Sequence, residues 1–175
     1  MSNTFALTAP RQPFAVFSPC KRYRYLLGWP AKEGGHGVAL FVLANPSTAT
    51  AEQTDPTVAR CIGYAARWGY EWCHVVNVRA WRETDPDKLP ADPAAIGPEN
   101  DEAIRDAVRK ATIVVCGWGK LGGARGLAAL RIIREAGGSP LALKLNLDGS
   151  PAHPLYQRSA ARPFPMPGVD AARCV

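Results

Sequence analysis

The chain has 175 residues, of which 47% are hydrophobic and 21% are charged, and a formal net charge of +6. These values are typical of one globular domain. No apolar run approaches the ~20 residues that span a bilayer, and Met1 to Pro13 does not resemble a signal peptide. We therefore expect a cytoplasmic protein without a membrane partner, and its basic charge favours a polyanionic one.

The cysteines argue against a metal centre. There are five, an odd number, and no two of them form a Cys-x-x-Cys pair. Cys61, Cys73 and Cys116 lie in apolar stretches, where cysteine packs as a small hydrophobic residue. No cluster of His, Asp and Glu has metal-ligand spacing either, so we expect no metal and no cofactor.

The first part of the chain changes from irregular to buried structure. Residues 1–20 contain three prolines and no helical period, which predicts an irregular N-terminal arm. The aromatic stretch Arg22 to Trp29 is expected to be extended, as an edge strand. Val38 to Leu43 is a continuous apolar run of strand length, the pattern of a strand buried on both faces.

Helices and strands then alternate along the sequence. Thr54 or Asp55 can cap a helix whose first turn contains Pro56. The expected helices cover residues 55–70, 98–110 and 124–136, and the expected strands cover residues 72–78, 112–116 and 141–145. Residues 157–175 are expected to form an irregular C-terminal tail. This alternation predicts a single α/β domain over residues 1–175, with three α/β/α layers and a central, mainly parallel sheet of four strands. The N-terminal arm is expected to add to this sheet in antiparallel orientation.

Polar residues follow three of the predicted strands. Asn45-Pro46-Ser47-Thr48 comes after the first buried run, Asn77 interrupts the second, and His153-Pro154 follows the last. In an open parallel sheet ligands bind at the carboxyl ends of the strands, so these segments are predicted to converge on one pocket.

Each of these residues offers specific chemistry. Pro46 keeps Asn45 extended, so its amide can hold a water or a substrate. The hydroxyls of Ser47 and Thr48 suit a phosphate, although Asn-Pro-Ser-Thr is also ordinary turn chemistry. Asn77 has both a donor and an acceptor for the edge of a nucleobase. His153 can stabilise a developing anion.

Two further segments are candidates for substrate binding. Gly117-Trp118-Gly119 is glycine-rich without the spacing of a phosphate-binding loop, so it indicates a tight turn from strand to helix whose amides could hold an anion. Arg79 follows Asn77 and is expected to bring positive charge to the pocket mouth.

The order of these motifs resembles the uracil-DNA glycosylase superfamily. Leu43 to Ser47 is similar to its first motif, where a polar residue positions the attacking water, and Val75 to Val78 is similar to the strand whose Asn reads a pyrimidine. Gly117-Trp118-Gly119 and His153-Pro154-Leu155-Tyr156 resemble its third strand end and its late His-Pro loop. The resemblance implies a glycosylase-like fold, Asn45 and His153 as catalytic residues, and a role in DNA repair as a hydrolase.

The whole chain more closely resembles an uncharacterised bacterial family of domains of unknown function. The shared segments are Asn45 to Ala49, Asp55-Pro56-Thr57 with Arg60, Gly97 to Asp101, Gly117 to Gly119, and His153 to Tyr156. This resemblance implies no established activity.

Two functions follow as hypotheses. In the first, the protein hydrolyses the N-glycosidic bond of a base in DNA or in a nucleotide, with Asn45 and His153 as catalytic residues. The substrate would be bound by Ser47, Thr48, Asn77, Arg79, Gly117 and Trp118, and its phosphates would meet Arg22, Arg24, Arg79 and Arg158. In the second, the same pocket belongs to a non-catalytic module that binds a nucleobase, a nucleotide or a nucleic acid.

Overall fold

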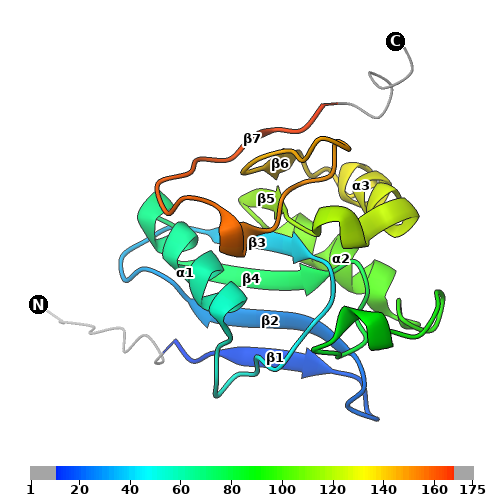
Figure 1. Cartoon of the computed structure of the whole chain (residues 1–175). Helices are drawn as coiled ribbons and strands as arrows, with labels where there is room; N and C mark the ends of the chain where they lie inside the picture. The colour runs from blue at the N-terminus through cyan, green and yellow to red at the C-terminus, as the bar shows by residue number, and fades with distance from the viewer. Residues whose placement is uncertain (1–10, 168–175) are drawn as a thin grey trace, which may run out of the picture.

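The computed structural model describes residues 11–167, which form one twisted sheet with helices on both sides (Figure 1). The strands are β1 (Phe14–Phe17), β2 (Arg24–Pro30), β3 (Val38–Leu43), β4 (Trp72–Asn77), β5 (Ile113–Cys116), β6 (Pro140–Ala142) and β7 (Phe164–Pro165). The α-helices are α1 (Pro56–Trp68), α2 (Asn100–Lys110) and α3 (Gly123–Glu135). Three short 3-10 helices are η1 (Pro86–Lys88), η2 (Gly119–Gly122) and η3 (Pro154–Tyr156).

The sheet corrects the predicted fold class. It has seven strands in the order β1-β2-β4-β3-β5-β6-β7, rather than four. It is also mixed: the pairs β1–β2, β2–β4 and β6–β7 are antiparallel, whereas β4–β3, β3–β5 and β5–β6 are parallel. The prediction of a mainly parallel four-stranded, glycosylase-like sheet was therefore wrong.

The additional edge strands come from segments that contain prolines. Residues 14–17, in the N-terminal arm, form β1 and pair with β2, which agrees with the expected antiparallel addition from that arm. Gly28 makes this pairing close, because a Cβ there would lie 2.2 Å from the ring of Phe14. Residues 164–165, in the expected tail, form β7. Both strands lie at the edges of the sheet. There a proline is tolerated, because the backbone is paired with a neighbouring strand on one side only.

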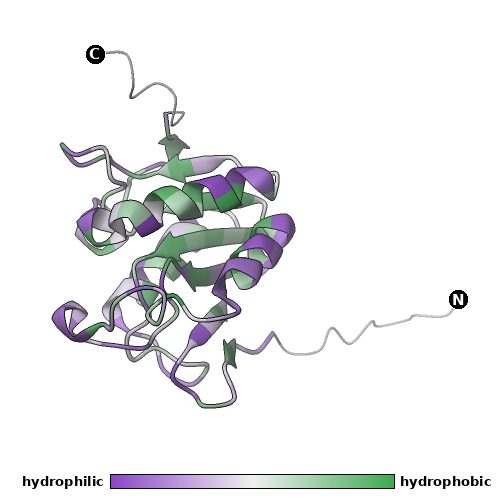
Figure 2. Cartoon of the chain, turned by 90° about the vertical axis from the view of Figure 1, so that its right-hand side faces the viewer, coloured by the Kyte–Doolittle hydropathy of each residue, from purple (hydrophilic) through white to green (hydrophobic). Residues whose placement is uncertain are grey.

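The two faces of the sheet bury different residues. Along β3, Phe41 and Leu43 pack towards α1, while Leu40 and Val42 pack towards α2 and α3. Figure 2 shows hydrophobic colour along the central strands and hydrophilic colour on the outer turns of the helices. Within residues 11–167, no helix has both the length and the apolar character needed to cross a membrane.

The connections create a crevice at one end of the sheet. β3 leads into α1 on one face, and the neighbouring strand β5 leads into α3 on the other face. The chain therefore leaves these two parallel strands in opposite directions. Such a switch point is the place where open α/β sheets bind ligands, outside the carboxyl ends of the strands.

Candidate functional site

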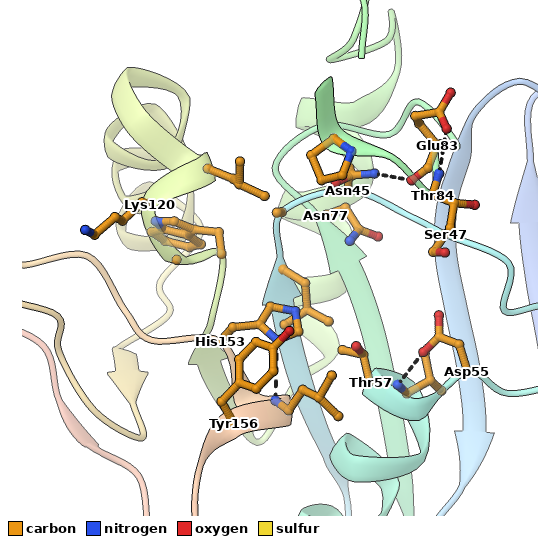
Figure 3. A pocket seen from close by; sticks show the side chains of 18 of the residues that line it. Asn45, Ser47, Asp55, Thr57, Asn77, Glu83, Thr84, Lys120, His153 and Tyr156 are labelled. Carbon is orange, nitrogen blue, oxygen red and sulfur yellow. Dashed lines mark hydrogen bonds between the residues drawn. The ribbon is translucent and has the colours of Figure 1, made fainter. Parts of the chain in front are cut away.

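A pocket of about 420 Å³ lies at this switch point. Its volume falls within the roughly 300–1,000 Å³ of small-molecule sites. Residues after β3, at the end of β4 and after β5 line it, together with the N-terminus of α1 and the loop before η3. The polar side chains come from eleven residues: Arg24, Asn45, Ser47, Asp55, Thr57, Asn77, Glu83, Thr84, Lys120, His153 and Tyr156 (Figure 3). We call this cavity the main pocket.

Asn77 presents its amide nitrogen to the main pocket. Its side chain is 1% exposed, and its Oδ1 accepts a hydrogen bond from Nη2 of Arg24 at 3.3 Å. Because a guanidinium can only donate, the atom facing Arg24 must be the oxygen. Nδ2 is then the group of Asn77 that remains free to donate a hydrogen bond.

Arg24 is a buried charge beside the pocket. It is 2% exposed and donates to the carbonyl of Ala49 at 2.8 Å and to Asn77, while its Nε has no partner. No carboxylate of the described residues forms a salt bridge with it. Burial lowers its pKa to about 10, Asp55 opposes that shift and Arg82 adds to it, so Arg24 stays positive at neutral pH.

A second buried residue, Asn100, holds the backbone at the end of β4, where Asn77 lies. Asn100, at the start of α2, donates from Nδ2 to the carbonyls of Asn77 and Val78 at 2.9 and 3.1 Å. Arg125 of α3 also donates to the carbonyl of Val78, at 2.6 Å, and pairs with Asp101. The end of β4 is thus held by both helices of that face, which fixes where the amide of Asn77 lies.

His153 enters the pocket from the loop before η3. Its Nδ1 accepts the backbone N–H of Leu155 at 3.4 Å, so in the neutral ring the proton is on Nε2. Burial lowers the pKa of His153, and Asp55 opposes that shift. His153 is therefore a neutral donor at pH 7.

The loop that carries His153 is held at both ends. The hydroxyl of Tyr64 in α1 donates to the carbonyls of Gln157 and Arg158 at 3.1 and 2.9 Å. At the other end, the N–H of Gly119 donates to the carbonyl of Pro151 at 2.8 Å. Gly117 permits this packing, since a Cβ there would lie 2.6 Å from Cδ of Pro154.

Asp55 supplies the carboxylate that faces His153. It is the N-cap of α1, and its Oδ1 accepts the N–H of Val58 at 2.8 Å. One oxygen thus caps the helix, and the side chain also lines the main pocket. Figure 3 shows Asp55 across the pocket from Lys120.

Asn45 and Trp118 form parts of the pocket wall. Nδ2 of Asn45 donates to the carbonyls of Glu83 and Pro46, at 2.7 and 3.2 Å, so only its Oδ1 remains for a water or a ligand. The indole of Trp118 is 3% exposed and packs on Gly122 and Gly126, where a Cβ would lie 2.0 and 2.5 Å from it. Among the described residues, no group of three or more His, Cys, Asp or Glu could hold a metal ion.

The structure brings five of the predicted site residues to the main pocket, namely Asn45, Ser47, Asn77, Trp118 and His153. Three others lie outside it. Arg79 is held by two hydrogen bonds to Asp92, of 2.9 and 2.8 Å, and so does not line the pocket mouth. Gly117 packs under Pro154, and Thr48 is exposed next to the pocket.

Sequence reasoning missed Glu83 and Lys120, and it assigned Asp55 only to a helix cap. It expected Arg24 to meet phosphates rather than to lie buried behind Asn77. The aromatic stretch around Arg24 gives no sign of this position. Arg24 reaches the pocket because β2 runs antiparallel to β4, which puts the start of β2 beside the end of β4.

Fold and pocket together define a mixed α/β protein with a polar ligand pocket at the switch point of its sheet. The chain belongs to the family described as "Protein of unknown function (DUF1643)", whose model matches residues 24–155. The matched region begins at Arg24 and ends at Leu155, which both line the main pocket. Comparisons with curated proteins and with solved structures gave no significant match.

Proposed function

We propose that the main pocket binds a nucleobase that carries an oxo group and hydrolyses its N-glycosidic bond. The observation that carries the proposal is the juxtaposition of neutral His153, the carboxylate of Asp55 and the oriented amide of Asn77 in one pocket. The hydrophobic wall at Trp118 suits a planar base.

The reaction places a different demand on each group. A water adds its oxygen to the sugar carbon and gives one proton to Asp55. Its other hydrogen stays on the new hydroxyl group and is oriented by a hydrogen bond to Oδ1 of Asn45. The electron pair of the broken C–N bond leaves with the base, which becomes an anion. Nε2–H of His153 and Nδ2–H of Asn77 donate to the oxo group on which that charge accumulates. Donors fixed before the reaction stabilise such charge without reorganisation.

Arg24 strengthens this arrangement without contacting the base. Its positive charge lies behind the oxygen of Asn77, so it polarises the amide and stabilises negative charge in the pocket. A buried guanidinium without a carboxylate partner costs several kcal/mol, and an anion formed in the pocket offsets part of that cost.

The test is base release from labelled oligonucleotides, single- and double-stranded, and from free nucleosides. The panel carries uracil, hypoxanthine, xanthine and mismatched bases. We expect release by the wild type and a loss of at least about a hundredfold in Asn45→Ala, His153→Ala and Asp55→Asn, as is typical when one acid, base or oxyanion donor is removed. Arg131→Gln changes an exposed residue of α3 and is the matched control, with activity near that of the wild type.

A specific observation favours the second candidate, a module that binds the base without chemistry. The amide nitrogen of Asn45 and one oxygen of Asp55 are already engaged by the backbone. If the folded wild type binds an oxo base but releases none from any substrate, hydrolysis is excluded and binding is the function.

A further inference from the structure

A second pocket, of about 340 Å³, adjoins the main pocket. The two share Ser47, Glu83 and Thr84 in their walls. The rest of the second pocket comes from the turn between β1 and β2 and from the segment after β4, with Lys21, Arg22 and Arg82 as its cations. We call it the cationic pocket.

Among the described residues, none of the three cations has a carboxylate partner, although hydrogen bonds from Ser18 and Arg22 lower the pKa of the neighbouring Cys20 thiol to about 7. No salt bridge within residues 11–167 involves Lys21, Arg22 or Arg82, whereas Arg79 and Arg125 each pair with an aspartate. The Nε of Arg82 is buried and has no hydrogen-bond partner. Glu83 also lines the pocket, but its Oε1 accepts the N–H groups of Thr84 and Asp85 at 2.8 and 3.0 Å. The wall therefore has three cations against the single carboxylate of Glu83, and a net positive charge remains.

The cations are held next to one another. The guanidinium of Arg22 lies 5.7 Å from the ring centroid of Trp81, and that of Arg82 lies 4.9 Å from the centroid of Phe17. Arg82 also donates from its backbone to the carbonyl of Arg22 at 2.9 Å and from Nη1 to that of Lys21 at 3.2 Å. Stacked guanidinium groups lose less freedom when they bind an anion, so this cluster is pre-organised.

The backbone at this turn is strained in a way that fits a binding role. Lys21 has a φ of 60°, a value that residues other than glycine rarely adopt. Residues in such conformations cluster at ligand sites, where the surrounding structure holds them in place. Here the turn places a lysine and an arginine side by side at the mouth of the pocket.

We propose that the cationic pocket binds a phosphate group of the ligand whose base enters the main pocket. Three cations without a carboxylate partner and the hydroxyls of Ser47, Thr48 and Thr84 match the charge and the acceptor oxygens of a phosphate. This inference rests on the proposed function for the base, and it makes the substrate a phosphorylated nucleoside rather than a free base. The phosphate belongs either to a free nucleotide or to a nucleic-acid strand.

The experiment compares deoxyuridine, deoxyuridine 5′-monophosphate and a five-residue single strand containing deoxyuridine, by calorimetric titration. We expect the monophosphate to bind about tenfold more tightly than the nucleoside for each charge-assisted hydrogen bond that its phosphate accepts. Lys21→Gln combined with Arg22→Gln should remove that difference. Arg131→Gln combined with Lys144→Gln loses the same charge at exposed positions elsewhere and should keep it.

The source of the phosphate follows from the third ligand. If the strand binds more tightly than the monophosphate, and its affinity falls steeply with salt, the ligand is a nucleic acid. Equal affinities identify a free nucleotide.

Binding of inorganic pyrophosphate tests the cationic pocket independently of the proposal that a base binds in the main pocket. If no nucleoside binds, pyrophosphate binding that the Lys21 and Arg22 double variant loses still supports the phosphate site. The proposal is overturned if the monophosphate binds no more tightly than the nucleoside. It is also overturned if the double variant, with an unchanged thermal midpoint, still binds the monophosphate more tightly. Arg82→Gln is a second variant, with the same expected loss.

Discussion

At the scale of single residues, the orientation of one amide decides which group of Asn77 is available to a ligand in the main pocket. Arg24 holds the oxygen of Asn77, so Asn77 offers a donor. In the proposed function this donor selects an oxo group over an amino group. An isolated asparagine side chain has no such preference, because its two ends can exchange by a rotation. Selectivity therefore resides in the pair rather than in Asn77 alone.

Replacing Asn77 by aspartate tests this pair. In Asn77→Asp the carboxylate forms an ion pair with Arg24, but the donor is lost. We expect a thermal midpoint no lower than that of the wild type, together with at least about tenfold weaker binding of an oxo base, as for the loss of one hydrogen bond to a buried site. Asn77→Ala is the companion variant: it leaves Arg24 with one partner fewer, so both stability and binding should fall. Unchanged affinity in Asn77→Asp would contradict the role of the donor.

The sequence shows only part of this site. Asn45, Asn77 and His153 were predicted because polar residues that follow apolar runs lie at strand ends. The place of Arg24 could not be predicted in the same way, because it depends on the antiparallel pairing of β2 with β4. The assignment of Arg79 to the pocket failed for a related reason, since Asp92, in a distant loop, holds its guanidinium.

At the scale of elements, helix α1 is both a support and a source of chemistry. Its N-cap, Asp55, accepts the N–H of Val58 and also lines the main pocket. Asparagine caps a helix as well as aspartate does, whereas alanine does not. The two roles of Asp55 can therefore be separated by substitution.

We expect Asp55→Ala to lower the free energy of unfolding by about 1 kcal/mol, the usual cost of a lost N-cap, and to abolish base release. Asp55→Asn should leave the free energy of unfolding within a few tenths of a kcal/mol of the wild-type value, and it should still abolish base release. Urea unfolding and the release assay measure the two effects. If Asp55→Asn is fully active, Asp55 is a cap and nothing more.

Helix α3 supports the opposite wall of the pocket through its glycines. A Cβ at Gly126 would lie 2.5 Å from the indole of Trp118, so Gly126→Ala must displace that ring. We expect a loss of about 1–3 kcal/mol in the free energy of unfolding, the usual cost of overpacking.

Gly63→Ala is the control in α1, where nothing lies within 4 Å of the added Cβ. It should stabilise the protein by roughly 0.4–1 kcal/mol. Thermal unfolding distinguishes the two changes, and equal effects would show that Trp118 accommodates the extra methyl group.

The elements of the sheet centre were easier to predict than its edges. β3 covers the same residues that the apolar run Val38 to Leu43 indicated. α1 begins at Pro56, one residue after the expected start of the helix, and Asp55 is its cap. The arm was expected to add an antiparallel strand, but the bounds of β1 were not predicted. β7 was missed because it is short and lies next to prolines, and its pairing depends on β6, which is distant in sequence. Long-range pairing of this kind leaves little local signal.

At the scale of the whole molecule, acid should destabilise the fold through two half-buried histidines, His74 and His153. Burial, assisted by Lys110, lowers the pKa of His74 to about 4, and burial also lowers that of His153. The unfolded chain then binds more protons than the folded one below a pH of about 6.5, the ordinary value for histidine. The free energy of unfolding should therefore fall as the pH drops from about 6.5 towards 4.

Urea unfolding at a series of pH values measures this loss. His74→Gln removes one titrating group, so its stability should fall less steeply across that range, whatever its value at pH 7.5. His36 is exposed, with its ring 5.4 Å from that of Tyr70, and it provides the control as His36→Gln, with the slope of the wild type. Parallel curves for all three proteins would exclude His74 as a source of the acid sensitivity.

The main pocket draws its walls from both ends of the described chain, with Arg24 at one end and His153 at the other. During synthesis, Arg24 is added to the chain long before His153. While the parallel centre of the sheet is being made, the guanidinium of Arg24 and the amide of Asn77 have no histidine facing them. Domains fold as units as they emerge during synthesis. Because the loop of His153 follows β6 in the chain, the pocket is complete only after this loop has been made. A chain truncated before His153 therefore contains strands β1 to β6 but lacks part of the pocket wall.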